Sequence, residues 1–221
     1  MLTALAPALP IALGTVLATL PLVGVPLILA TRNDQAPHLA FLGGWILGIV
    51  GLGAAVIALS DLSAPGAGPP ARWVVWLRLA LGLGLIVLAA RKLVRRAGPG
   101  DDEVPGWMRA FETMGAMRAF GLGILLVVAN PKNAALVASG ALTIAAATYA
   151  PSAQMGALVG FALAASLGVA VPLMLTLALG ERAERALTGM KGFMARNGKT
   201  IVSAVLLVLG AMVVANTLAD L

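Results

Sequence analysis

The chain has no cysteine, one histidine and few charged residues, and these absences narrow its chemistry. Without cysteine there are no disulfides, thiolate metal sites or thiol redox reactions. No His/Asp cluster supports hydrolysis, and no Walker-type Gly-Lys-Ser/Thr sequence supports ATP use. Charged residues make up 11% of the chain, against about 25% in soluble domains, and 60% of residues are hydrophobic. We therefore expect a polytopic membrane protein that is not an enzyme and needs no cofactor or metal.

Six apolar segments are long enough to span a bilayer, which takes about 20 residues. They predict an all-α membrane protein without room for a separate soluble domain. The first segment lacks a preceding basic region, so we interpret it as a retained span and not a signal peptide. The predicted spans cover residues 4–30, 38–60, 73–93, 118–147, 152–180 and 199–219.

Basic residues lie mostly in the loops after the first, third and fifth predicted spans. The net charge of +6 therefore reports topology and does not indicate nucleic-acid binding. The positive-inside rule places these loops in the cytoplasm and both termini outside. The composition fits a bacterial chain, so the predicted location is the bacterial cytoplasmic membrane. The basic residues concerned are Arg32, Arg91, Lys92, Arg95, Arg96, Arg109, Arg118, Arg182, Arg185, Lys191, Arg196 and Lys199. Arg72 and Arg78 begin the third span on the opposite side.

Three spans on each side of a cytoplasmic linker predict two repeats of opposite topology. The first repeat is residues 1–93, the charged linker 94–117, and the second repeat 118–221. Similar local sequences support the pairing of the halves. They are Leu83–Ala89 with Leu209–Ala215, Gly44 and Gly48 with Gly156 and Gly160, and the prolines of spans 1 and 4. We expect helices 1 and 4 to be broken or kinked. The glycine pairs favour close helix packing within the bundle, with a dimer interface as the alternative.

Lys132 is the single charge between residues 120 and 147, inside the tetrapeptide Asn130-Pro131-Lys132-Asn133. An unpaired charge at bilayer depth costs roughly 2.5–3.5 kcal/mol on insertion scales. No acidic residue lies inside a predicted span, so a carboxylate partner is disfavoured. Carbonyls freed by Pro131, that of Val127 first, or by Pro7 and Pro10 are a second option. A neutral amine is the third. Lys132 is the predicted site for an anionic or strongly polar headgroup, with Asn130 and Asn133 orienting it. Snorkelling, or holding two broken helices together, is the structural alternative.

These residues resemble a known family. The Asn130–Asn133 sequence, a first span with Ala6-Pro7 and Pro10-Ile11, and Phe41–Trp45 with Gly48 are similar to the GAP (peptidoglycolipid-addressing protein) family of the lysine-exporter (LysE) superfamily. Amino-acid exporters of that superfamily carry Pro-Gly-Pro in span 1, whereas this chain has Pro7-Ala8-Leu9-Pro10. The departure favours the lipid branch. The resemblance implies a dimeric exporter that moves an envelope glycolipid or related lipid outward, with the two prolines and the span 4 sequence at its site.

Other functions stay open at this point. A small-solute exporter for amino-acid-like metabolites needs a closed polar cavity, and an accessory subunit of a lipid export machine needs a partner. Proton coupling has only Lys132 and His38 as titratable candidates, and a lone histidine at a span end is more often incidental. The predicted partners are a lipid or glycolipid substrate, the surrounding membrane lipids and a second copy of the chain.

Overall fold

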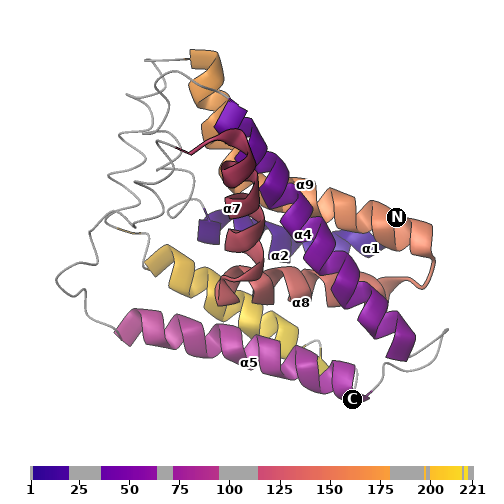
Figure 1. Cartoon of the computed structure of the whole chain (residues 1–221). Coiled ribbons are helices and arrows are strands. Elements are labelled where there is room, and N and C mark those ends of the chain that lie inside the picture. The colour runs from indigo at the N-terminus through magenta and orange to yellow at the C-terminus, as the bar shows by residue number, and fades with distance from the viewer. Residues whose placement is uncertain are drawn as a thin grey trace.

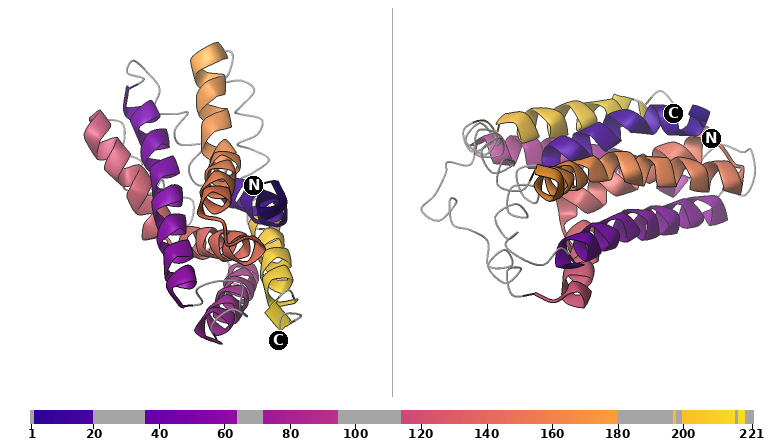
Figure 2. Two further views of the ribbon diagram at one scale, coloured as in Figure 1. Left: turned by 90° about the vertical axis from the view of Figure 1, so that its right-hand side faces the viewer. Right: turned by 90° about the horizontal axis from the view of Figure 1, so that it is seen from above.

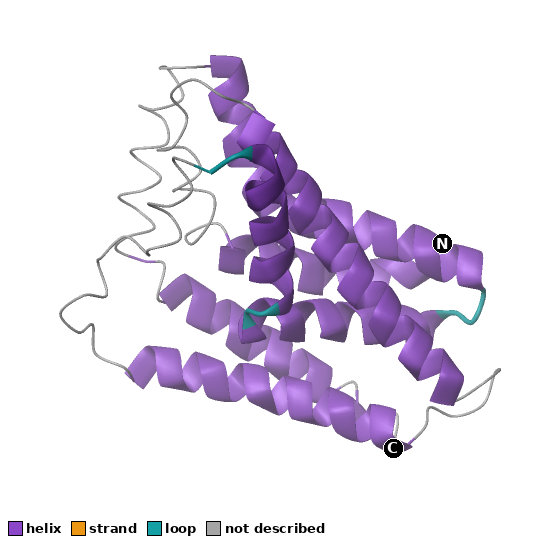
Figure 3. Ribbon diagram, in the orientation of Figure 1, coloured by secondary structure: helices purple, strands orange, loops and turns teal. Residues whose placement is uncertain are grey.

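The described residues of the computed structural model are helical, apart from short turns, and no strand occurs among them (Figure 3). They comprise residues 2–19, 36–63, 72–94, 114–179, 197, 200–215 and 217–218. The helices are α1 (Leu2–Leu5), η1 (Ala6–Ala8), α2 (Leu9–Thr19), α4 (Ala36–Ser63), α5 (Arg72–Val94), α7 (Ala116–Val128), α8 (Pro131–Ala147) and α9 (Pro151–Leu179). A further apolar helix, here called the 200–215 helix, covers Thr200–Ala215.

Three helices are long and apolar enough to cross a membrane, and they match predicted spans 2, 3 and 5. Their spanning parts are Ala36–Leu62, Arg72–Val94 and Pro151–Met174. Predicted span 4 is the pair α7 and α8, bent by 72°, which would make a fourth crossing. The described parts of spans 1 and 6 form shorter apolar helices, Leu2–Leu17 and Thr200–Ala215. The all-helical membrane class is therefore confirmed, whereas six spans in an inverted repeat stay a prediction. Most of the predicted linker 94–117 lies outside the described residues.

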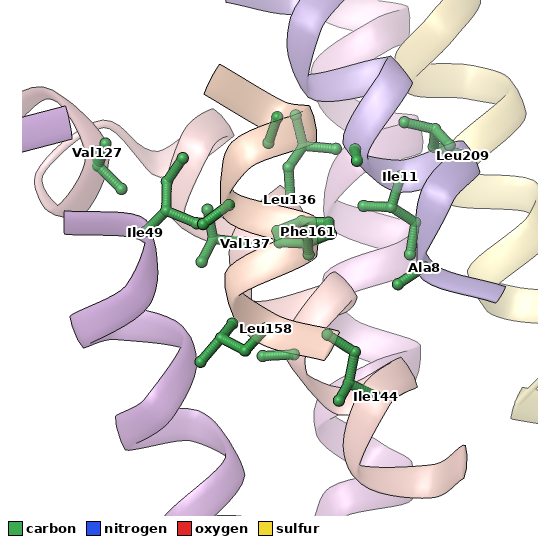
Figure 4. Close-up of a cluster of buried hydrophobic side chains, with 14 of the residues drawn as sticks. Ala8, Ile11, Ile49, Val127, Leu136, Val137, Ile144, Leu158, Phe161 and Leu209 are labelled. Carbon is green, nitrogen blue, oxygen red and sulfur yellow. The ribbon is translucent and has the colours of Figure 1, made fainter. Parts of the chain in front are cut away.

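Helix α8 occupies the centre of the bundle (Figures 1 and 2). Helix α8 contacts α4, α5, α7, α9 and the N-terminal segment, which comprises α1, η1 and α2. Its buried face presents Leu136, Val137 and Ile144 to the core, and a Cβ on Gly140 would lie 2.6 Å from Cε2 of Phe161 on α9. Figure 4 shows this cluster, which also draws Ala8, Ile11, Ile49, Val127, Leu158 and Leu209 from the surrounding helices. The side chains of α8 therefore lie at the middle of the protein.

The N-terminal segment is interrupted at Pro7 by the single 3-10 turn η1, because proline cannot donate a helical hydrogen bond. Within residues 2–19 the helix tightens locally at this turn, and residues 20–30 of predicted span 1 lie outside the described residues. The buried residues of this segment, Ala4, Ala8 and Ile11, face the bundle. The rings of Pro7 and Pro10 lie on its exposed face.

Helices α4 and α7 run side by side in the same direction and approach through glycine. A Cβ on Gly44 would lie 2.8 Å from the carbonyl carbon of Phe120 and closer still to its oxygen. A Cβ on Gly123 would lie 2.7 Å from the backbone nitrogen of Trp45. A Cβ on Gly48 would lie 3.2 Å from Cα of Ile124. The Gly44 and Gly48 pair therefore serves packing within the chain, as small residues do between membrane helices.

A tight turn joins α8 to α9, where the sequence predicts a hairpin. Helix α9 starts at Pro151, and its first turn closes with a hydrogen bond from the Gln154 amide to the Ala150 carbonyl, 3.0 Å long. The side-chain amide of Gln154 donates to the Thr148 carbonyl at 3.0 Å and to Asp61 of α4 at 3.3 Å. The turn is thereby tied to the last turn of α4, at the end of the bundle away from Lys132.

Candidate binding site at the break between two helices

The break between α7 and α8, residues 129–133, is here called the elbow. Helix α7 ends with the hydrogen bond from the Ala129 amide to the Leu125 carbonyl, 2.8 Å long. Asn130 follows in an extended conformation with φ −85° and ψ 112°. That conformation is the one favoured by a residue that precedes proline. Pro131 then occupies the first position of α8, where a missing N–H leaves no internal hydrogen bond unmade. The sequence therefore sets both the position of the break and the start of the new helix.

Both asparagines of the elbow cap helix ends. Oδ1 of Asn130 accepts a hydrogen bond from the Lys132 amide at 3.1 Å, which is the usual N-cap interaction. Nδ2 of Asn133 reaches back and donates to the Leu126 carbonyl on α7 at 2.9 Å. The sequence predicts that Pro131 frees the carbonyl of Val127, which is the residue after Leu126. The acceptor that Asn133 satisfies is that of Leu126, whose helical donor would be the amide of Asn130.

One polar atom of the elbow is buried without a hydrogen bond. Oδ1 of Asn133 has no partner in the part of the chain that the structure describes, and the residue is 3% exposed. An orphaned acceptor in a low-dielectric interior is destabilising by about 1–3 kcal/mol. A ligand hydroxyl or a water molecule would satisfy it. Asn133 thus has one half of its amide committed to the fold and the other half available.

Lys132 occupies the second position of α8 and is partly buried. The N-terminus of a helix carries a partial positive charge, which favours anions and disfavours a cation. Lys92, in the last turn of α5, adds positive potential at Lys132. Lys132, Lys92 and the positive end of α8 therefore lie in one region beside the bundle centre. An anionic group placed there would be attracted by all three.

Arg78 is a second buried cation, and sequence reasoning missed it as a site residue. It is 9% exposed, and its Nη2 atom donates to the Leu142 carbonyl of α8 at 2.8 Å. The sequence interpretation grouped it with Arg72 as a topology signal at the start of span 3. Arg78 lies six residues further in, and its spacing from Lys92 puts both on one face of α5. That helical spacing was the signal that would have distinguished Arg78 from Arg72.

The structure does not bring His38 to the elbow. His38 is buried in the first turn of α4. Helix α4 passes Ile124 and Val127, near the end of α7, at Gly48. Ten residues of helix separate His38 from Gly48, a rise of about 15 Å. Pro7 and Pro10 are exposed on the N-terminal segment, which contacts α8, and their part in the site stays a prediction. Of the predicted site residues, the elbow unites Asn130, Pro131, Lys132 and Asn133.

Comparison with known protein families places this chain beside a described family. The family model described as Sap, sulfolipid-1-addressing protein, matches residues 8–219, nearly the whole chain. Comparisons with curated proteins and with solved structures found no match. The match agrees with the predicted resemblance to lipid-addressing proteins, while membership of the wider lysine-exporter superfamily stays a prediction. The exposed apolar faces of its long helices and this match together identify the chain as a membrane protein of the sulfolipid-1-addressing protein family.

Proposed function

We propose that the chain is a transporter that moves an envelope lipid or glycolipid outward across the bacterial cytoplasmic membrane. The elbow is its headgroup site. The observation that supports this most strongly is Lys132 at the N-terminus of α8, next to Lys92, within the bundle. This arrangement attracts an anion. The family description, which names the addressing of a sulfolipid, fits a lipid whose headgroup carries negative charge.

The division of roles within the elbow follows from its hydrogen bonds. Lys132 supplies charge, and the free Oδ1 of Asn133 accepts a hydrogen bond from a headgroup hydroxyl. Asn130 and Pro131 hold the end of α8 in place and act as positioning residues. Both termini outside, a cytoplasmic 94–117 linker and a homodimer complete the proposed transporter. Neither an enzymatic step nor a cofactor is part of it.

Export by a Lys132→Met variant tests the proposal. Bacteria that lack the chain are complemented with the native protein, with Lys132→Met, or with Arg118→Met as a matched control. Arg118 is exposed in the first turn of α7, so Arg118→Met removes a cation from the neighbouring helix without changing the elbow. Surface and total lipids are compared by mass spectrometry at equal levels of inserted protein. We expect Lys132→Met to reduce the surface lipid at least about tenfold, the factor produced by about 1.4 kcal/mol. The control should export normally.

Reconstitution distinguishes the alternatives. Purified chain in liposomes that moves lipid from one leaflet to the other acts alone. Lipid movement only with an added partner complex would identify an accessory subunit, and release of amino acids would identify a small-solute exporter. Normal lipid export by correctly inserted Lys132→Met would refute the elbow as the headgroup site.

A further inference from the structure

One face of α5 carries two cations separated by small and apolar residues. Arg78, Gly82, Leu85, Ala89 and Lys92 follow the spacing i, i+4, i+7, i+11, i+14, which keeps them on one side of a helix. All but Lys92 are buried, and Lys92 is half-buried. Arg91, next to Lys92 in the sequence, is exposed on another face. The face that α5 turns toward the protein is therefore positively charged near both ends.

Helix α8 presents a matching polar face. Lys132, Ser139 and Thr143 are spaced i, i+7, i+11 and lie on one side of the helix. Thr143 donates its hydroxyl hydrogen to the Ser139 carbonyl at 2.8 Å. The Ser139 hydroxyl is 3% exposed and has no hydrogen-bond partner among the described residues. Neither the fold nor the packing of α8 accounts for a buried, unused hydroxyl at this position.

Helices α5 and α8 contact each other and run antiparallel, in what is here called the seam (Figure 1). At one end Lys92 adds positive potential at Lys132, and at the other Nη2 of Arg78 donates to the Leu142 carbonyl. Ten residues of α8 separate these two levels, a rise of about 15 Å. That is about half of a hydrocarbon core about 30 Å thick. The seam thus carries basic side chains at two levels along α8.

Between these two levels the same face of α5 is buried, in part against the 200–215 helix. Leu85 and Ala89 of α5 are 0% exposed, and Gly82 packs on the 200–215 helix, where its added Cβ would lie 3.1 Å from the Gly210 carbonyl. Helix α5 and the 200–215 helix therefore form a tightly joined pair (Figure 2). A pair of this kind is suited to move as one body relative to α8, because the glycine contact is tight and the α5–α8 contact includes like charges.

We propose that the seam between α5 and α8 is an anion pathway with two stations, Lys92 with Lys132 and then Arg78, past the Ser139 hydroxyl. The ligand is a sulfate- or phosphate-bearing group, which meets a cation at each depth. This inference rests on the proposed function for its direction, but the pathway itself is a property of α5 and α8. Export through the elbow alone would require no role for Arg78 or Ser139.

The absence of cysteine allows a direct test on the purified full chain in phosphatidylcholine nanodiscs. Ser139→Cys introduces the single thiol. Its reaction rates are measured with two methanethiosulfonates, one carrying a sulfonate and one carrying a trimethylammonium, each normalised to a free thiol in solution. Ser166→Cys is the matched control, since Ser166 is similarly buried but lies on α9 and donates to the Ala162 carbonyl. A thiolate attacks these reagents, forming a mixed disulfide and releasing methanesulfinate, so labelling occurs only where water and ions enter.

We expect Ser139→Cys to react, with about a tenfold preference for the anionic reagent, as a positive path concentrates anions. Ser166→Cys should be inert. Adding Lys92→Gln or Arg78→Gln to Ser139→Cys should abolish most of the preference, while Arg91→Gln leaves it unchanged. Arg78→Lys keeps the charge and should retain the preference, which separates a charge effect from loss of packing. If Arg78→Gln does not fold, the comparison of Lys92→Gln with Arg91→Gln decides whether the anion preference depends on a cation of the seam.

Protection experiments identify the source of the anion. Phosphatidylglycerol in the nanodisc that slows labelling identifies a lipid headgroup, and sodium sulfate that slows it identifies a free anion. Either result supports an anion pathway. Labelling of Ser139→Cys that is absent, or present with no charge preference, would overturn the seam. In that case, loss of export by Lys132→Met would still support the proposed headgroup site. Conversely, an anion-selective seam together with normal export by Lys132→Met would overturn only the headgroup site.

Discussion

The glycine contact between α4 and α7 gives a prediction with a built-in control. Gly43 and Gly44 are neighbours in α4, so alanine at either gains the same helix propensity, about 1 kcal/mol. Their surroundings differ. A Cβ on Gly43 would lie 3.8 Å from the Phe120 ring, which is ordinary van der Waals contact. A Cβ on Gly44 would lie 2.8 Å from the Phe120 carbonyl carbon, about 0.6 Å short of the distance at which ordinary contact begins.

The magnitude follows from what the added methyl group meets. At Gly44 the neighbour is backbone, which cannot rotate away, so α7 must shift as a whole. Forcing one methyl into a close-packed contact costs about 1–3 kcal/mol. Because helix propensity cancels between the two variants, Gly44→Ala should be less stable than Gly43→Ala by this amount. The Gly43→Ala variant itself should match or slightly exceed the native chain.

The assay is unfolding of the purified chain in mild detergent by added dodecyl sulfate, followed by circular dichroism. Gly51→Ala serves as a second control, since an added Cβ there meets nothing within 4 Å. Equal midpoints for the Gly44 and Gly43 variants would refute the close approach of the two backbones. That result would also mean that α4 does not hold α7, the helix that leads into the elbow, in place.

Two further predictions concern polar groups inside the bundle. Asn133→Leu removes the donor to the Leu126 carbonyl, and we expect a loss of about 1–3 kcal/mol in the same unfolding assay; a stability equal to native would show that the elbow does not need this cap. Arg78→Met removes the donor to the Leu142 carbonyl, whereas Arg78→Lys keeps the charge and a donor on a shorter side chain. We expect Met to be less stable than Lys by about 1 kcal/mol, near the range measured for hydrogen bonds between membrane helices, and the reverse order would contradict a role for Arg78 in joining α5 to α8.

The sequence predicted the elements governed by local rules. Helices α4, α5 and α9 begin and end within three residues of the predicted spans, because long apolar runs and the flanking Gly and Pro residues determine them. The elbow was also foreseen, since Asn-Pro ends one helix and begins the next. The tight turn before Pro151 follows from the same chemistry.

Interactions across the fold could not be predicted in the same way. Whether Asn133 orients a ligand or caps α7 depends on the 72° bend, which brings its amide to the Leu126 carbonyl. The role of Arg78 depends on Leu142, which is 64 residues away in the sequence. A count of basic residues by loop assigns Arg78 to topology, and only the packing of α5 on α8 gives it a different role. Pro7 and Pro10 are exposed on the first segment, and their part in the site stays a prediction.

The separation between Arg78 and its acceptor has a consequence for biosynthesis. The elbow is capped by bonds between residues at most seven positions apart, so it can form as soon as that segment leaves the ribosome. Arg78 emerges 64 residues before Leu142, a delay of about 3–13 s at about 5–20 residues per second. During that interval α5 enters the bilayer with a buried cation that has no α8 to bind. Lipid phosphates or the insertion machinery must then hold α5 near the interface, and its final depth is set only when the second half of the chain arrives.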